Sequence, residues 1–181
     1  MHQVVVMNDC HWDWVDAPDG VVGVVASSTM VERIYYLSSK ESLEKNVYQD
    51  FPEACQAQSH LVMVALGQVK EYFHGERWIF ELPLNQGQLT GFQRAVHAVL
   101  MATRPGETVS YAELAELAGS SGAARAVGQV MASNPFPIVV PCHRVIRRDG
   151  SLGAYSAALG VASKQHLLAV ELQMNQNIST D

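Results

Sequence analysis

Strand-forming and helix-forming patterns occupy separate parts of this chain, and this separation limits the folds that it can adopt. Two runs of β-branched and aromatic residues, Val21–Val25 and Val31–Leu37, lie in the first 51 residues, and Asp19-Gly20 is a turn signal before them. From Pro52 to about His74, apolar residues recur at helical spacing. The pattern predicts a small sheet followed by one long helix.

A segment rich in glycine and glutamine, Asn85–Gly91, separates this part from the rest of the chain. Before it, Trp78–Leu84 is predicted to be a short extended segment, and after it a helix is predicted over Phe92–Ala102. We therefore predict two domains, an N-terminal one at residues 1–88 and a C-terminal one at residues 89–181.

Two short helices are predicted in the C-terminal domain, with a turn of glycine and serine between them. Ser110 is a candidate N-cap with Glu113 as its capping-box partner, opening a helix over Tyr111–Ala118 that Gly119 ends. The second helix is predicted to start at Ser120 or Ser121 and to reach about Ser133. This is the pattern of a helix-turn-helix. Most short helix pairs are packing units, so DNA binding and core packing both remain open.

The charge distribution bears on whether the predicted helix pair binds DNA or only packs in the core. The formal net charge of −6 argues against a protein that holds nucleic acid by electrostatic attraction alone. The segment Arg94–Lys164 nevertheless carries seven basic and four acidic residues. Uncharged stretches such as Phe136–Cys142 are too short for a membrane span, and the N-terminus lacks a leader pattern, so we expect a cytoplasmic protein with no membrane partner.

The three cysteines, Cys10, Cys55 and Cys142, are odd in number and widely spaced, which disfavours a disulfide framework. Cys142 follows an apolar run, Phe136–Val140, that predicts a buried extended segment. A lone cysteine is usually a small buried hydrophobic residue. The neighbouring His143 and Arg144 favour a reactive thiol instead, because cationic groups stabilise the thiolate. The residues by themselves leave the two interpretations open.

The run Pro141-Cys142-His143-Arg144-Val145-Ile146 resembles the signature around the acceptor cysteine of the O6-alkylguanine-DNA alkyltransferases, also called methylated-DNA–protein-cysteine methyltransferases. The resemblance continues in one register across Phe92–Glu171. Its other motifs are Phe92-Gln93, Gly106–Tyr111, Gly122–Gly128, Asn134-Pro135, Tyr155-Ser156 and Glu171. Several separately spaced motifs that agree are more specific than any one of them.

The resemblance implies an α+β fold: a small N-terminal α/β domain with a ribonuclease-H-like sheet plus helix, and a helical C-terminal domain with a winged-helix-like helix-turn-helix. It implies direct-reversal DNA repair. The alkyl group of O6-alkylguanine in double-stranded DNA, with O4-alkylthymine left open, moves irreversibly to Cys142 after the base is flipped. Each molecule then acts once. No cofactor is implied, and we expect a monomer.

Five residues have implied catalytic roles. Cys142 is the nucleophile, His143 takes its proton through a water, and Glu171 orients and stabilises that imidazole. Tyr111 rotates the phosphate beside the target and gives a proton to guanine N3. Asn134 orients the turn that holds the cysteine.

Other residues have implied binding roles. Arg125 enters the base stack and fills the space that the flipped base leaves. The small side chains of Ala123 and Ala124 allow the second helix to approach the DNA backbone in the minor groove. The expected guanine pocket is formed by Tyr155, Ser156 and backbone groups near Cys142 and Val145.

The chain departs from the family pattern at three places. His97 stands where a tryptophan is frequent, and Ala157-Ala158 replaces a glycine-rich pair, which we expect to narrow the pocket and to close positive φ to that loop. Some members bind zinc through cysteines and histidines. Here Cys10, His11 and His2 lack a paired spacing, so we predict no metal.

Three other functions compete with repair. A damage sensor of the same fold lacks the acceptor thiol, which this chain has. A transcriptional regulator needs more basic charge and a dimer interface or a sensor domain. A cysteine hydrolase places its histidine far from the cysteine in sequence and needs an oxyanion hole. The sequence shows neither the features of such a regulator nor the signature of a cysteine hydrolase.

Overall fold

A four-stranded sheet forms the first part of the computed structural model, which describes residues 10–178, with side chains to residue 176. β1 (His11–Ala17), β2 (Gly20–Ala26) and β3 (Val31–Leu37) form an antiparallel meander, and β4 (Cys55–Gln56) lies parallel to β1. The strand order is β3-β2-β1-β4, so β3 is an edge strand. The two strands predicted from the sequence are confirmed.

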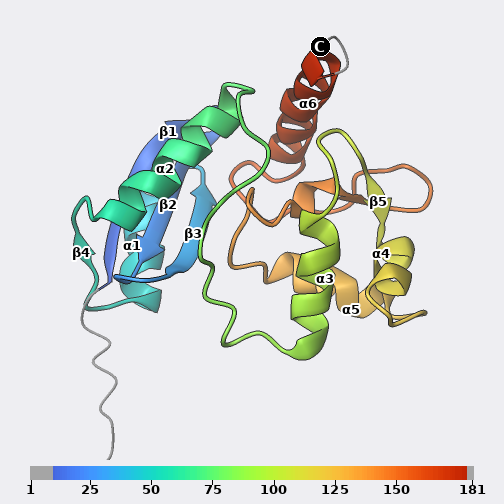
Figure 1. Cartoon of the computed structure of the whole chain (residues 1–181), viewed down its shortest axis with the longest axis horizontal. Coiled ribbons are helices and arrows are strands. Elements are labelled where there is room, and N and C mark those ends of the chain that lie inside the picture. The colour runs from blue at the N-terminus through green and yellow to red at the C-terminus, as the bar shows by residue number, and fades with distance from the viewer. Residues whose placement is uncertain (1–9, 179–181) are drawn as a thin grey trace, which may run out of the picture.

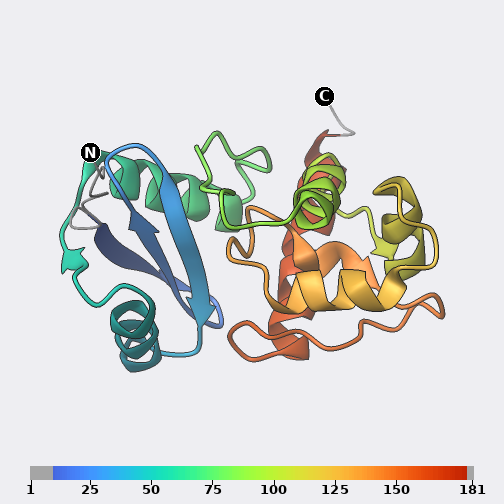
Figure 2. The ribbon, with the colours of Figure 1, turned by 90° about the horizontal axis from the view of Figure 1, so that it is seen from below.

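Helices cover both faces of this sheet, α1 (Lys40–Asp50) on one face and α2 (His60–Phe73) on the other (Figures 1 and 2). Successive side chains of a strand point to opposite faces, and six of the seven residues of β2 are buried. Gly23 of β2 has no Cβ, and one built there would lie 2.4 Å from a methyl carbon of Leu43 on α1. Glycine at this position therefore allows α1 to pack closely on the sheet.

Two predictions for this region are wrong. The sequence-based prediction has no helix at α1, because this helix is mostly polar and buries only Leu43 and Val47. α2 begins at His60 rather than near Pro52, because the intervening residues form β4 and pair with β1. The predicted end is confirmed, since Gly75 follows the last turn at a φ of 79°.

The rest of the described chain is mainly helical, with α3 (Gly91–Met101), α4 (Tyr111–Leu117), α5 (Ala124–Ala132) and α6 (Val161–Ile178). It also contains a two-stranded sheet of β5 (Val109–Ser110) and β6 (Val145–Ile146). Within residues 10–178, none of the helices is long and apolar enough to cross a membrane. We call residues 10–88 the sheet half and residues 89–178 the helical half. The fold is mixed α+β, as predicted.

Capping fixes the starts of two of these helices. α3 begins after Thr90, which forms a capping box with Gln93, and α4 begins after Ser110, which forms one with Glu113. Both starts were predicted within one residue. α5 begins later than predicted, at Ala124, because Gly122 before it has a φ of 83° and cannot belong to a helix.

Edge strand β3 joins the sheet half to the helical half. The amide of Ile34 donates to the carbonyl of Pro135 at 2.9 Å, and the carbonyl of Tyr36 accepts from the amide of Ala158 at 2.8 Å. At the start of the strand, the amide of Val31 donates to the carbonyl of Pro83 at 2.8 Å, so the predicted extended segment lies against β3. Loops on both sides of Cys142 in sequence are thus held by one strand.

His97 of α3, at the position where a tryptophan is frequent, lies in the core of the helical half with 1% of its surface exposed. Neither ring nitrogen has a hydrogen-bond partner among the described residues. Burial lowers the pKa of His97 to about 4, so the ring is neutral at pH 7 and packs as an apolar group.

Candidate active site

A tight turn, rather than the predicted extended segment, leads into Cys142. The segment Phe136–Val140 is buried as expected, but Ile138 has a φ of 74°, which no β-strand residue adopts. Asn134 holds the turn at two points: its Oδ1 accepts from the amide of Phe136 at 3.0 Å, and its Nδ2 donates to the carbonyl of Val140 at 2.9 Å. This geometry fits the role expected for Asn134.

Cys142 begins a short 3-10 helix, Cys142–Arg144, with 7% of its surface exposed. Burial raises the pKa of the thiol, while the neighbouring side chains of Asn134 and Tyr155 act in the opposite direction. The side chain of Tyr155 is buried next to the thiol, and burial raises the pKa of its hydroxyl, so this hydroxyl stays protonated. The resting cysteine is therefore a thiol, and a nucleophilic attack requires a base.

His143, the residue after Cys142, is fully buried, and its ring has one hydrogen-bonded and one unbonded nitrogen. Nε2 lies 2.7 Å from Oε1 of Glu171, whereas Nδ1 has no hydrogen-bond partner among the described residues. A carboxylate only accepts hydrogen bonds, so Nε2 carries the proton and Nδ1 has the free lone pair. Burial lowers the pKa of His143, which keeps the ring neutral and able to accept a proton.

Glu171 of α6 is fully buried, and it accepts several hydrogen bonds besides that of His143. Arg144 donates to both of its oxygens, from Nε at 2.8 Å and from Nη2 at 2.9 Å, and the amide of Gly106 donates at 3.1 Å. Burial opposes ionisation, but His143 and the Arg144 guanidinium outweigh it and lower the pKa of Glu171 to about 2. Glu171 is therefore a carboxylate at neutral pH.

Tyr72 of α2 reaches the same carboxylate from the sheet half. Its hydroxyl donates to Oε1 of Glu171 at 3.0 Å and lies 3.3 Å from Nε2 of His143. Neither Tyr72 nor Arg144 was assigned to the site from the sequence. Arg144 lies inside the cysteine motif and could have been suspected, whereas Tyr72 appeared only as one apolar position of a predicted helix.

We predict that Tyr72→Phe slows the alkyl transfer that the resemblance implies, by roughly 3- to 10-fold, and lowers the free energy of unfolding by about 1 kcal/mol. The ring contacts with Phe73 and His143 remain, so only the hydroxyl is lost. The measurement is the single-turnover rate against pH together with urea unfolding. Tyr48→Phe, at an exposed tyrosine, is the control. A rate profile identical to that of the natural chain would contradict a role for this hydroxyl.

A pocket of about 140 Å³ opens beside the thiol. Tyr111 of α4 forms one wall, with its ring over Gly128 of α5, where a built Cβ would lie 4.0 Å from the ring. The remaining lining comes from α5, from Cys142 and from the loop after it. These residues are Met131, Ala132, Ala154, Tyr155 and Ser156. Tyr111, Cys142, Tyr155 and Ser156 are thus brought together as expected.

The other expected binding residues lie outside this pocket. Arg125 is exposed on α5, one helical turn before Gly128 and hence on the same side of the helix. Ala123 and Ala124 are half-buried at the start of α5. Val145 is fully buried. Its carbonyl accepts a hydrogen bond from Nζ of Lys164, which also donates to the carbonyl of Leu152.

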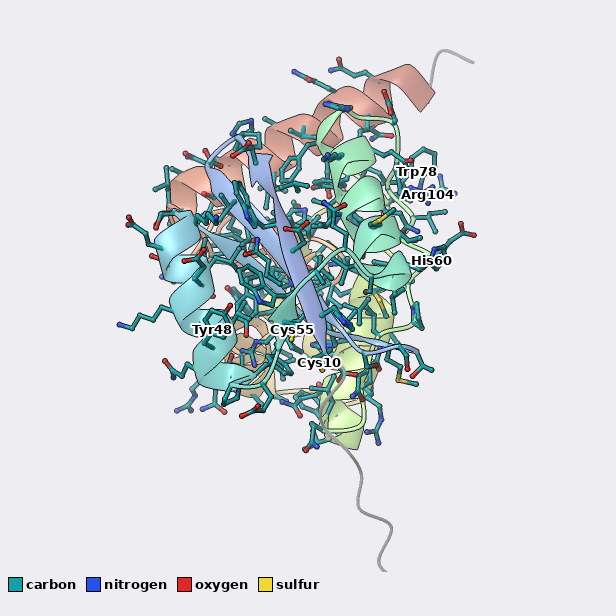
Figure 3. The ribbon with its side chains drawn as sticks, turned by 90° about the vertical axis from the view of Figure 1, so that its left-hand side faces the viewer. Cys10, Tyr48, Cys55, His60, Trp78 and Arg104 are labelled. Atoms are coloured by element: carbon teal, nitrogen blue, oxygen red, sulfur yellow. The ribbon has the colours of Figure 1, made fainter. Side chains whose placement is uncertain are left out.

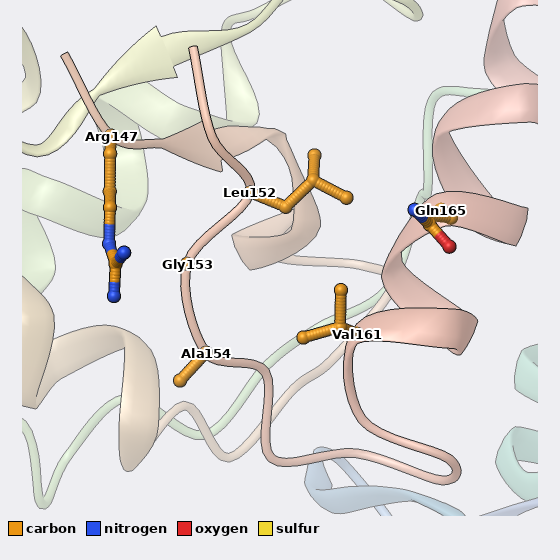
Figure 4. Close-up of a pocket in the computed structure, with 6 residues that line it drawn as sticks. All are labelled: Arg147, Leu152, Gly153, Ala154, Val161 and Gln165. Atoms are coloured by element: carbon orange, nitrogen blue, oxygen red, sulfur yellow. The ribbon is translucent and has the colours of Figure 1, made fainter. Parts of the chain in front are cut away.

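An open groove of about 500 Å³ shares Ala154 with this pocket and is also lined by Leu152 and Gly153 (Figure 4). Arg147 lies on one side of the segment Leu152–Ala154, and Val161 and Gln165 of α6 lie on the other. The exposed guanidinium of Arg147 thus stands close to the wall of the pocket.

The loop at Ala157-Ala158 has a different backbone conformation from the one expected from the sequence. Ala158 has a φ of 43°, so alanine does not close positive φ to this loop, and that expectation is wrong. The hydrogen bond from its amide to the carbonyl of Tyr36 holds the left-handed conformation in place. The lining of the small pocket includes neither Ala157 nor Ala158.

The structure describes only some of the candidate zinc ligands. Cys10 directly precedes β1 and Cys55 begins β4, and the amide of Cys55 donates to the carbonyl of Cys10 at 3.0 Å (Figure 3). His2 lies outside the described residues. Among the residues that are described, no three histidine, cysteine or acidic side chains are grouped to hold a metal ion.

This fold and site define a class of protein in which a buried cysteine lines a small pocket beside the short helices α4 and α5 and is followed in sequence by a histidine that contacts a buried carboxylate. Residues 91–173 match the model of the 6-O-methylguanine DNA methyltransferase DNA-binding domain. The chain belongs to the methylated-DNA–protein-cysteine methyltransferase family, whose activity is direct-reversal DNA repair.

Two relatives and one solved structure show the extent of the similarity. The constitutive methylated-DNA–protein-cysteine methyltransferase of Bacillus subtilis is 33% identical over 82% of this chain and 87% of its own length. The protein with that name from Mycolicibacterium paratuberculosis is 36% identical over 87% and 89%. The crystal structure of Mycobacterium tuberculosis OGT in complex with DNA has a TM-score of 0.76 at 31% identity, covering 91% of this chain and 94% of the other.

Proposed function

We propose that this chain transfers the alkyl group of O6-alkylguanine in double-stranded DNA to its own Cys142. The observation that carries this assignment is a thiol at the wall of a small pocket, beside a neutral histidine whose Nδ1 is unbonded. A damage sensor needs no such thiol. No group in the site can regenerate a thiol from a thioether, so the transfer is irreversible and each chain acts once.

The reaction is a displacement at the alkyl carbon. Nδ1 of His143 takes the thiol proton through a water, and Glu171 stabilises the imidazolium that forms. The sulfur bonds to the alkyl carbon, the bond between this carbon and O6 breaks, and its electron pair stays on the guanine. Tyr111 gives a proton to N3 of the leaving base and regains one from water.

DNA binding is assigned to the helix pair α4 and α5. The target base leaves the duplex and enters the pocket that Tyr111, Tyr155 and Ser156 line. Arg125 takes its place in the stack, and Ala123 and Ala124 bring α5 close to the minor-groove backbone. Exposed basic side chains near α4 and α5 contact DNA phosphates. DNA binding therefore does not require a positive net charge of the whole protein.

The finer fold assignments belong to the same proposal. A meander of three strands followed by a strand parallel to the first is the basis for a ribonuclease-H-like N-terminal domain at residues 1–88. The helix pair next to the two-stranded sheet of β5 (Val109–Ser110) and β6 (Val145–Ile146) is the basis for a winged-helix-like C-terminal domain at residues 89–181.

All the residues to which we assign a role in binding or catalysis come from one chain, so we propose a monomer. A cytoplasmic location stays a prediction.

The test is the intact mass of the protein after reaction with a duplex that carries one O6-methylguanine. We expect one hydrogen to be replaced by one methyl group per chain, with no turnover beyond one equivalent. Peptide mapping should place the methyl group on Cys142. Catalytic turnover, or a methyl group on Cys10 or Cys55, would show that the mechanism is wrong.

Arg125→Ala is expected to slow repair of duplex DNA by about 10-fold or more, while reaction with free O6-methylguanine changes little. The side chain holds the base out of the stack, and unstacking costs a few kcal/mol. Single-turnover rates on both substrates measure the difference. Arg94→Ala, at an exposed arginine on α3, controls for the loss of one positive charge. Equal losses on both substrates would refute the stacking role.

A further inference from the structure

The two-stranded sheet of the helical half brings a tyrosine and an arginine together. β5 and β6 are parallel, and their register sets Ser110, the last residue of β5, opposite Ile146, the last residue of β6. Tyr111 follows β5 directly, and Arg147 follows β6 directly. Because parallel strands run in the same direction, this register places Tyr111 and Arg147 at the same end of the sheet.

The side chains of both residues lie against Gly153. A Cβ built on Gly153 would lie 3.3 Å from the hydroxyl oxygen of Tyr111 and 3.7 Å from both Cγ and Nε of Arg147. Figure 4 shows the Arg147 side chain alongside the backbone of Gly153. The missing side chain at Gly153 leaves room for both groups. The guanidinium of Arg147 is thus close to the phenol hydroxyl that forms part of the pocket wall.

A short turn holds the backbone of Arg147 in place. Its amide donates to the carbonyl of Ser151 at 2.8 Å. Lys164 of α6 ties the two sides of this turn together, because its Nζ donates to the carbonyls of Val145 and Leu152. The Arg147 side chain is exposed, and a guanidinium keeps its charge in proteins. A fixed positive charge therefore stands near Tyr111 before DNA binds.

The proposed reaction needs a charge of this sign at this place. Burial and then the negative charge of a Cys142 thiolate raise the pKa of Tyr111, whereas the Arg147 guanidinium lowers it. After Tyr111 gives its proton to N3 of guanine, its oxygen carries a negative charge, and the phosphate beside the target nucleotide adds another nearby. A cation that is already in position stabilises the charge that develops in such a step. Arg147 is the described cation that acts on this hydroxyl.

From this geometry we propose that Arg147 is a positioning residue for the general acid, and that its guanidinium stabilises the phenolate that Tyr111 becomes when it protonates N3 of the departing guanine. In this step the O–H bond of Tyr111 breaks, an N3–H bond forms, and the electron pair of the O–H bond stays on the phenolate oxygen. The phenolate then takes a proton from water. The inference rests on the proposed function and deepens it by naming the residue that assists Tyr111.

The experiment compares single-turnover rates at saturating DNA on two duplexes. One carries O6-methylguanine, and the other carries O6-methyl-3-deazaguanine, in which a C–H group replaces N3 and accepts no proton. The natural chain should react more slowly with the second duplex. Arg147→Gln should slow transfer from O6-methylguanine by about 10-fold, because Tyr111 becomes a weaker acid, and should leave the rate with the 3-deaza duplex unchanged. Arg147→Lys keeps the charge and should recover most of the lost rate.

Two controls separate this role from a general loss of charge or of structure. Arg148→Gln removes the same charge from the next residue, which is also exposed, and should leave the ratio of the two rates unchanged. In a Tyr111→Phe background, Arg147→Gln should have no further effect on the rate with O6-methylguanine, because two residues that act through one step are not additive. Since the Arg147 side chain is exposed, its replacement leaves the core intact.

The outcomes separate the two proposals. Absence of methyl transfer from O6-methylguanine by the natural chain would overturn the proposed function itself. If the natural chain transfers the methyl group, three results would overturn the role of Arg147. These are equal rates of the natural chain on both duplexes, an Arg147→Gln rate equal to that of the natural chain, and an equal loss on both duplexes. The last result would show that Arg147 only holds a phosphate.

Discussion

Cys142→Ala is expected to abolish alkyl transfer completely while the protein still binds duplex DNA that carries O6-methylguanine. The thiol is the group that forms the new bond, whereas binding is assigned to α5 and the pocket walls, so the two functions separate. The change also removes the buried sulfur without adding volume, which favours an intact fold. Intact mass and a gel-shift titration with the same duplex measure transfer and binding.

Cys55→Ala is the matched control, because this thiol is exposed on β4 and distant in sequence from the motif. It should transfer the methyl group at the rate of the natural chain. Residual transfer by Cys142→Ala would identify a second acceptor, and loss of binding would show that the thiol also supports the DNA complex.

Glu171→Gln is expected to reduce both rate and stability. The carboxylate stabilises the imidazolium of His143, so its loss raises the pKa of Cys142 in the reacting complex and slows transfer by about 100-fold, a range typical of general-base assistance. Arg144, with 3% of its surface exposed, then keeps a buried charge without a counter-ion. Breaking a buried pair in this way costs about 3–5 kcal/mol.

The double variant Glu171→Gln with Arg144→Gln separates the two effects. It removes both charges, so stability should recover in part, because a neutral replacement of a buried ion pair is often tolerated. The rate should stay low, since no carboxylate faces His143. Urea unfolding and single-turnover rates against pH measure the two quantities. A double variant that regains the rate would show that Glu171 acts only through Arg144.

The same carboxylate gives the fold a dependence on pH. Its pKa falls from 4.5 to about 2 on folding, so its contribution to stability is fully present above pH 4.5 and is lost as the pH decreases toward 2. A shift of this size corresponds to about 3 kcal/mol. Glu171→Gln should therefore show a weaker loss of stability across this pH range than the natural chain.

Local features of the sequence predicted much of the helical half. Each capping box joins residues three positions apart, Thr90 with Gln93 and Ser110 with Glu113, so its hydrogen bonds can be anticipated from the sequence. The missed helix α1 has a simpler cap, in which the Ser39 side chain accepts from the amide of Ser42. It buries only two side chains, and its apolar pattern is too weak to stand out.

The sequence by itself determined strands β2 and β3, the caps of α3 and α4, and the resemblance that singled out Cys142, because these depend on residues close together in the chain. The tertiary structure decided the surroundings of the thiol. Glu171 meets His143 across 28 positions, Tyr72 meets Glu171 across 99, and β3 forms hydrogen bonds with the loops on both sides of Cys142. Such contacts arise only when the sheet half packs on the helical half, since burial and hydrogen bonding between distant segments leave no periodic pattern in either one.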